Sequence, residues 1–334
     1  MTSKTHPSQA KYDPIFPTVS QIPLGLLLFF CLLLILRNAD VAVRAMRQGL
    51  SLCAQTVIPA LFPFMVLSEM IATCGVGTSL LCRFSKPLGR LLRLSEAGCC
   101  AYLLGTLCGF PIGTRYTTVA LAQGRITQEE AERVIGISSC PSSAFLISAV
   151  GTALFGSTGF GIALYVSVLA AALCTGLLLT HLPNSRKTAA CAPIQSVPPH
   201  TPISVKTFCD AMRTSATNML LICAYVVFFS ALIGTFAYFP PVQALPEAAR
   251  AALFCLFELS SGMNQAATLP SSIHAACLAA FAAGWSGISV HCQTLSLCDR
   301  TGLSLRPYFA SKLMQSILAP LILLGILTLL PITV

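Results

Sequence analysis

Long apolar stretches separated by short polar ones run through the whole sequence. From Val134 to Ser185 there is no Asp, Glu, Lys or Arg. A helix that crosses the hydrocarbon of a bilayer needs about 20 mostly apolar residues. Four stretches meet this requirement without interruption and are predicted to be transmembrane helices: Val19–Leu36, Phe160–Thr180, Asn218–Phe239 and Leu313–Leu330.

Other apolar stretches are interrupted by proline, glycine or polar residues. They are Leu50–Leu81, Ala97–Ala122, Val134–Phe155 and Ala251–Leu297. Backbone groups that such interruptions free are tolerated in a membrane only inside protein or around a water-filled cavity. The pattern predicts an all-α polytopic membrane protein with about eight to ten membrane-embedded segments, several of them broken or re-entrant helices.

Composition supports a membrane protein and excludes a nucleic-acid-binding one. Of the 334 residues, 55% are hydrophobic and only 9% are charged, whereas soluble domains have about 25% charged residues. The net charge of +9 comes from basic residues between apolar stretches, such as Arg37–Arg47 and Arg83–Arg93, where they would meet lipid headgroups. We expect the lipid bilayer as partner, no nucleic acid, and a multi-pass location in the cell (cytoplasmic) membrane.

A polar linker divides the chain into two halves that resemble each other. Ala45-Met46-Arg47 recurs as Ala211-Met212-Arg213, and each begins a basic amphipathic stretch that continues into a long apolar helix. Internal duplication is typical of transporters, although apolar sequences also align by chance. The predicted organisation is a polar tail (1–18), an uncleaved first transmembrane helix (19–37), repeat 1 (40–182), the linker (183–207) and repeat 2 (208–334).

Two of the interrupted stretches contain clustered polar residues. In the first half, Cys140-Pro141 is flanked by serines; in the second, the sequence Gly284–Gln293 reads GWSGISVHCQ. Two half-helix ends facing each other would present N–H groups and carbonyls to a small polar ligand. Serines can instead hold helices together, and that alternative stays open.

Two carboxylates lie within apolar stretches. A carboxylate at the centre of a membrane helix costs about 2.5–3.5 kcal/mol, so it marks a functional site by default. Glu258 is the stronger candidate because serines and Asn264 follow it; the alternative is a pairing with Arg250 or a backbone group. Glu69 could equally cap a helix end. The candidate substrate-binding residues are Glu258, Ser286, Ser289, Gln293, Ser138, Ser139, Ser142, Ser143 and Asn264.

Other motifs point to structure rather than to catalysis. Thr127 and Glu130 have the spacing of a capping box and predict a solvated helix start. Arg115, after the interruption Gly109–Gly113, is either an interfacial anchor or an anion-pairing group. No metalloprotease, phosphate-loop or nucleophile-elbow motif is present, and the sixteen cysteines form no zinc-type spacing. We expect no enzyme, no cofactor and no metal.

Several short sequence segments, taken in their order along the chain, resemble the YlbJ-type sporulation integral membrane protein family, which carries the nucleoside recognition (Gate) domain. These segments are PALFPFMVLSEM (Pro59–Met70), LLGTLCGFPIGTR (Leu103–Arg115), ALAQGRITQEEAERV (Ala120–Val134), PSSAFLISAVGTALFG (Pro141–Gly156), FELSSGMNQA (Phe257–Ala266) and GWSGISVHCQTLSL (Gly284–Leu297). The resemblance implies a multi-pass protein needed for sporulation, with two inverted repeats similar to those of concentrative nucleoside transporters.

The same resemblance carries over Glu258, Ser286, Ser289 and Gln293 as site positions. It implies a transporter-like protein that moves or senses a small polar solute, nucleoside-like at best, and it leaves a coupling ion and a homo-oligomer open. The alternative is a non-transporting membrane scaffold that recruits partners during sporulation.

Overall fold

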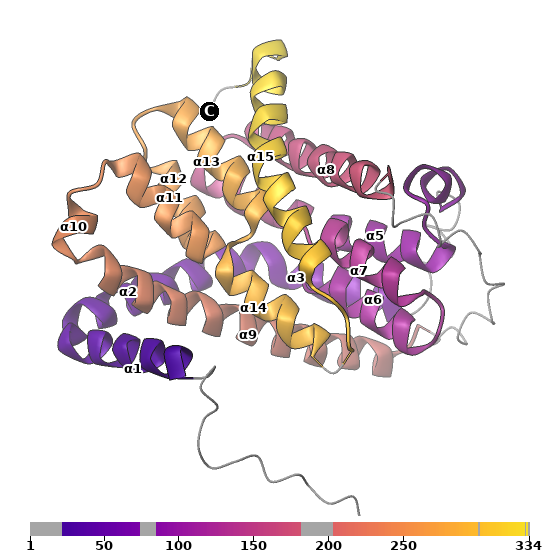
Figure 1. Ribbon diagram of the computed structural model, residues 1–334, viewed down its shortest axis with the longest axis horizontal. Coiled ribbons are helices and arrows are strands. Elements are labelled where there is room, and N and C mark those ends of the chain that lie inside the picture. Colours follow the sequence, from indigo (N-terminus) through magenta and orange to yellow (C-terminus); the bar gives the residue numbers. More distant parts are fainter. Residues whose placement is uncertain (1–21, 74–84, 182–202, 300, 331, 333–334) are drawn as a thin grey trace, which may run out of the picture.

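The computed structural model describes residues 22–73, 85–181, 203–299, 301–330 and 332, and within these residues it contains helices and no strand (Figure 1). In the first half the helices are α1 (Ile22–Arg37), α2 (Ala39–Leu52), the π-helix η2 (Cys53–Val57), α3 (Ile58–Thr73), α5 (Glu96–Cys108), α6 (Ile112–Ala122), α7 (Gln128–Ser138), the π-helix η3 (Phe145–Leu154) and α8 (Thr158–His181). In the second half they are α9 (Val205–Ala237), α10 (Pro240–Gln243), α11 (Glu247–Phe257), α12 (Leu259–Ala267), α13 (Ser272–Trp285), α14 (Gly287–Cys298) and α15 (Arg306–Leu329).

Five helical stretches in the described part of the chain are long and apolar enough to cross a membrane, or six if one bent pair counts as a span. The five are Ala39–Ile71, Thr158–Thr180, Val205–Ala237, Ser272–Cys298 and Arg306–Leu329, and the bent pair is Ser85–Leu92 with Glu96–Cys108, bent by 98°. The prediction of an all-α protein with several candidate membrane spans is confirmed for the described residues. Several other helices are shorter than a span because the chain breaks within its apolar stretches.

Parts of the predicted domain organisation lie outside the described residues. The polar tail 1–18 does so completely, and so does the linker up to residue 202. The last residues of the predicted linker, from Val205 on, already belong to α9. The predicted first transmembrane helix overlaps α1, which ends at Arg37 and is followed directly by α2. The 16 residues of α1 are fewer than a membrane span needs, so that this helix crosses the membrane stays a prediction.

Two long helices of equal length pack against each other. The continuous stretch Ala39–Ile71, made of α2, η2 and most of α3, has 33 residues, and α9 also has 33. Ala45 lies against Gly234 and Gly49 lies against Ser230, so the two helices run antiparallel. In Figure 1, α2 and α9 lie side by side along one edge of the molecule. Both of the predicted amphipathic stretches thus continue into apolar helices without a turn.

In the first half, two chain breaks pack against each other. One break joins α5 to α6 and the other joins α7 to η3. The N–H of Phe110 in the first break donates a hydrogen bond to the carbonyl of Cys140 in the second, at 3.0 Å. Gly109 has a φ of 81° and lies directly against the backbone of Ser142. A side chain here would suffer both a left-handed backbone and a collision.

The second half contains a similar pair of breaks. Helices α11 and α12 meet at Glu258, whose backbone is extended. Helices α13 and α14 meet at Ser286 and Gly287, which have φ values of 79° and 82°. A Cβ on Gly287 would lie 3.2 Å from the Cα of Glu258. These two breaks are therefore in contact, as are those of the first half.

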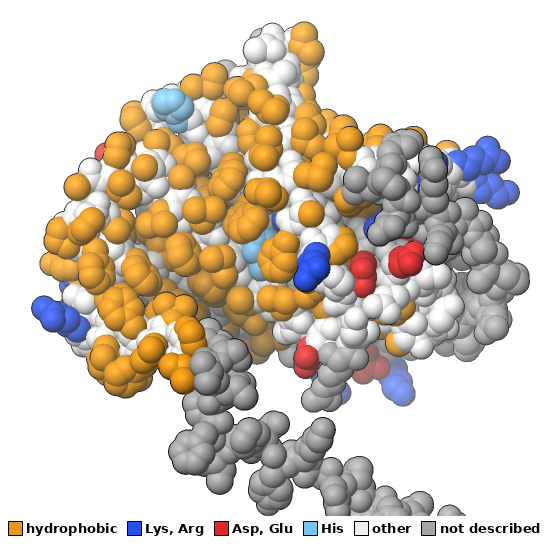
Figure 2. Space-filling view, in the orientation of Figure 1, with side chains coloured by type: hydrophobic (Ala, Val, Ile, Leu, Met, Phe, Trp, Pro, Cys, Tyr) orange, Lys and Arg blue, Asp and Glu red, His pale blue; other side chains and the backbone are white. Residues whose placement is uncertain are grey.

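The largest core cluster joins elements of both halves. It includes buried side chains from η3 and α8 of the first half and from α12, α13 and α15 of the second. Helix α13 contributes mainly alanines to it, such as Ala276, Ala279 and Ala283, which allow its neighbours to approach closely. Outside this core, apolar side chains cover much of the surface. Figure 2 shows them across most of one face, with the acidic side chains gathered on the side of α6 and α7.

Glu130 links the starts of two helices, and its burial differs from the predicted exposure to solvent. The capping part of the prediction is confirmed, since the Thr127 side chain accepts from the N–H of Glu130 at 3.2 Å. The predicted solvation is wrong: Glu130 is only 5% exposed. Its carboxylate accepts from the N–H of Ser95, the N-cap of α5, at 2.6 Å, because α7 packs against α5.

We expect the substitution Gly109→Ala to destabilise the protein. The left-handed backbone at this position costs about 1–2 kcal/mol for a residue with a Cβ, and the collision with Ser142 adds about 1–3 kcal/mol. Thermal unfolding of the purified protein in detergent measures the loss. Gly325→Ala is the matched control, because nothing lies within 4 Å of its Cβ position. An equal Tm for both variants would contradict the packing of the two breaks.

Glu130 should make stability depend on pH. Burial raises the pKa of its carboxyl, and the hydrogen bond from Ser95 opposes this only in part. Because the folded pKa lies above the unfolded one, the contribution of Glu130 to stability is present at acidic pH and is lost as pH rises through the folded pKa. Relative to Glu130→Gln, the wild type should lose Tm as the pH rises above the ordinary pKa of a glutamate, 4.5. A difference that does not change with pH, or that grows in favour of the wild type, contradicts this; Glu129→Gln controls for charge.

Candidate functional site

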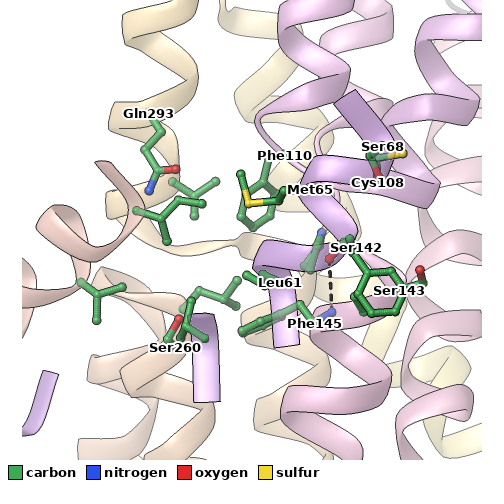
Figure 3. A pocket seen from close by; sticks show the side chains of 18 of the residues that line it. Leu61, Met65, Ser68, Cys108, Phe110, Ser142, Ser143, Phe145, Ser260 and Gln293 are labelled. Atoms are coloured by element: carbon green, nitrogen blue, oxygen red, sulfur yellow. Dashed lines mark hydrogen bonds between the residues drawn. The ribbon is translucent and has the colours of Figure 1, made fainter. Parts of the chain in front are cut away.

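A pocket lies where breaks of the two halves come together (Figure 3). The first half contributes Phe110, Ser142 and Ser143 to its wall, and the second half contributes Glu258 and Gln293. The cavity itself has a volume of about 60 Å³, which is smaller than that of most small-molecule sites, about 300–1,000 Å³. Its position between broken helices is the position in which transporters hold their substrates.

Apolar side chains form most of the remaining wall. Leu61 and Met65 come from α3, Val226 comes from α9, and Phe145 comes from the start of η3. Ligand sites in proteins combine such an apolar lining with a few placed polar groups. The antiparallel pair of long helices thus closes one side of the pocket, and the broken helices supply its polar groups.

Glu258 caps the half-helix that begins at the break. Its Oε1 accepts from the N–H of Ser260 at 2.9 Å and its Oε2 accepts from the N–H of Ser261 at 2.6 Å. The carboxylate is 2% exposed, and the N-terminus of a helix stabilises a negative charge there. Of the alternatives that the sequence left open, the pairing with backbone groups is the one observed. Each oxygen keeps lone pairs, so capping and contact with a solute are compatible.

The two serines after Pro141 bond to backbone groups that the break leaves free. Ser142 accepts from the N–H of Phe145 at 3.1 Å, and Ser143 donates to the carbonyl of Leu107 at 3.2 Å. Gln293 differs from them: its side-chain amide makes no hydrogen bond with any residue that the structure describes. The amide of Gln293 is therefore the polar group of the pocket that is most available to a ligand.

The other predicted site residues do not line this pocket. Ser138 and Ser139 are buried at the end of α7, where the hydroxyl of Ser139 bonds to that of Thr114 at 3.0 Å. Ser286 and Ser289 are buried around the second-half break, and Asn264 is exposed on α12. The structure thus brings together Ser142, Ser143, Glu258 and Gln293. Solute binding by any of the nine stays a prediction.

An ion pair ties the α5–α6 hairpin to α3. Arg115 of α6 and Glu69 of α3 are 2.8 Å apart, and their side chains are 45% and 12% exposed. Arg115 therefore pairs with an anion, which is one of the two roles that the sequence left open. Because the arginine is largely exposed, the pair contributes little stability.

A buried polar network that the sequence pattern does not predict lies behind the first-half break. Lys312 and Gln315 of α15 bond to the end of α7. Nearby, Nδ1 of His291 lies 2.7 Å from the hydroxyl of Tyr308. The signal that could have identified Lys312 is the one used for Glu258, an ionisable residue inside an apolar helix.

The single tryptophan marks the second-half break. Trp285 is the last residue of α13 before Ser286. Its indole N–H donates to the carbonyl of Leu256 on α11 at 3.0 Å, and its ring lies edge-on to His291 with centroids 4.5 Å apart. This side chain therefore connects α13 to the helix that precedes Glu258.

We expect Glu258→Ala to destabilise the protein by about 2–6 kcal/mol, because the N–H groups of Ser260 and Ser261 lose their acceptor at roughly 1–3 kcal/mol each. Glu258→Gln should cost about half as much, since its amide oxygen can still accept one of these bonds. Thermal unfolding measures both, and Glu247→Ala, at the exposed start of α11, is the control. If all three variants unfold alike, Glu258 does not hold the break.

Comparison with known proteins gives one informative match. No family model matches the chain, and no solved structure matches it significantly. The chain is 25% identical over 324 residues to the sporulation integral membrane protein YlbJ of Bacillus subtilis (strain 168), and the match covers 85% of this chain and 77% of that protein. Together with the five candidate spans, this similarity supports a multi-pass membrane protein. The chain resembles the YlbJ-type family of sporulation integral membrane proteins, as its sequence motifs predict.

Proposed function

We propose that this protein is a transporter-like, non-enzymatic protein of the cell membrane that acts in sporulation and moves or senses a small polar solute. The observation that carries the proposal is the pocket between the paired breaks, which combines the carboxylate of Glu258 with the amide of Gln293. A membrane protein tolerates broken helices and a buried carboxylate where they form a functional cavity.

The order of elements supports two inverted repeats, one on each side of the linker. In the first half, broken pairs α5–α6 and α7–η3 precede α8; in the second, broken pairs α11–α12 and α13–α14 precede α15. Equivalent helices of an inverted repeat run in opposite directions through the membrane. The antiparallel packing of the two 33-residue helices fits this requirement.

The chemistry of the wall favours a solute with both hydroxyl groups and an apolar ring. Glu258 can accept hydrogen bonds from hydroxyl or amino groups, and Gln293 can both donate and accept. Phe110 and Phe145 supply apolar and aromatic surface on the other side. A nucleoside combines these two properties, so a nucleoside-like solute is our first candidate.

We expect the purified protein to bind at least one member of a panel of nucleosides, nucleobases, sugars and amino acids. Gln293→Ala should weaken that binding about tenfold, the equivalent of one lost hydrogen bond of about 1.4 kcal/mol, and should leave Tm unchanged. Gln123→Ala is the matched control because Gln123 is exposed at the end of α6, away from the pocket. Titration calorimetry in lipid nanodiscs gives the affinities.

Uptake into liposomes then separates a transporter from a sensor. Accumulation of the bound solute by the wild type, and less by Gln293→Ala, shows movement; binding without accumulation shows sensing. If the folded protein binds no solute of the panel, the proposal fails and the scaffold role that recruits sporulation partners takes its place.

A further inference from the structure

A lysine is fully buried at the end of a broken helix. Lys312 of α15 is 0% exposed, and its Nζ donates to the carbonyl of Ser139 at 2.7 Å and to Oε1 of Gln315 at 3.0 Å. Gln315 is also 0% exposed, and its Nε2 donates to the carbonyl of Gly136 at 3.0 Å. These contacts join the last helix of the second half to the break of the first half.

The end of α7 is the counter-charge of this ammonium. The last carbonyls of a helix have no partner within the helix and carry a partial negative charge. A buried ammonium is costly unless such groups or a carboxylate neutralise it. Within the described residues no carboxylate oxygen lies within 4 Å of Lys312, because the one ion pair found there is that of Arg115 with Glu69. The carbonyl end of α7 therefore compensates the charge.

The other half has no such cation. In the proposed repeats, α8 of the first half corresponds to α15 of the second, and from Thr158 to His181 it contains no Lys, Arg, Asp or Glu. The cation at the end of a broken helix is therefore a feature of the first-half break alone. A general need for helix stability would not produce this asymmetry.

In transporters, the C-terminal ends of half-helices coordinate a free cation such as Na⁺. We propose that the ammonium of Lys312 is a built-in cation at the end of α7, so that this break keeps its form without a bound metal ion. Three residues after Ser139 the chain reaches Ser142 in the pocket wall, so Lys312 is a positioning residue for the pocket. The consequence that solute binding is not coupled to Na⁺ at this place rests on the proposed function, whereas the built-in cation itself does not.

The test compares thermal unfolding in detergent in the chlorides of sodium, potassium, ethylammonium and choline at equal ionic strength. The wild type should have the same Tm in all four. Lys312→Ser, which removes the ammonium and leaves room for a small cation, should lose about 5–10 °C in choline and recover at least half of this loss in ethylammonium or sodium. Lys312→Met, which fills the room without a charge, should be destabilised and recover in none of them.

Lys206→Ser is the matched control, because Lys206 is exposed at the start of α9; its Tm should not depend on the cation. If Lys312→Ser is folded only when purified in ethylammonium or sodium, the proposal is supported equally. A wild type stabilised by sodium over choline would overturn it. So would a Lys312→Ser variant that no small cation rescues or that is as stable as the wild type. These measurements need no solute, so their failure is distinguishable from failure of the proposed function.

Discussion

The buried charges of this membrane protein are neutralised by the ends of broken helices. Glu258 lies at the N-terminal end of α12, where N–H groups point at it, and Lys312 lies at the carbonyl end of α7. Without water, neither charge is stable in a membrane away from such an end. Equally, the N–H groups of Ser260 and Ser261 and the carbonyl of Ser139 have these charged groups as their partners. The breaks and the charges therefore require each other, and the remaining packing is arranged around them.

The breaks also satisfy one another, and this is how a pocket arises. Phe110 donates to Cys140, and Ser143 donates to Leu107, so each of the two first-half breaks completes the other. In the second half, Gly287 lies against Glu258. Because irregular backbone cannot pack as closely as two continuous helices, space remains where the two pairs of breaks meet, and the long helices α3 and α9 close it from the side.

Much of the fold follows from the apolar pattern, and the sequence also located the breaks. Proline at 141 and a carboxylate at 258 contradict an apolar helix, so both were identifiable. The sequence does not show which side of a break faces the pocket, because this depends on how one half packs against the other. Ser142 lines the pocket, whereas Ser139 does not. Lys312 was missed because it adjoins the predicted span Leu313–Leu330, whereas α15 begins at Arg306 and buries the lysine inside it. The local pattern around Glu130 predicts a solvated side chain, because its contact with Ser95 joins residues 35 positions apart.

Trp285 has a consequence for how motion in this protein can be observed. It is the single tryptophan of the sequence, and its indole connects α13 to α11 beside the second-half break. Indole emission responds to the loss of a hydrogen bond and to the polarity around the ring. The protein therefore carries an intrinsic fluorophore at one joint, and opening or closing of that joint can be followed optically in the unlabelled molecule.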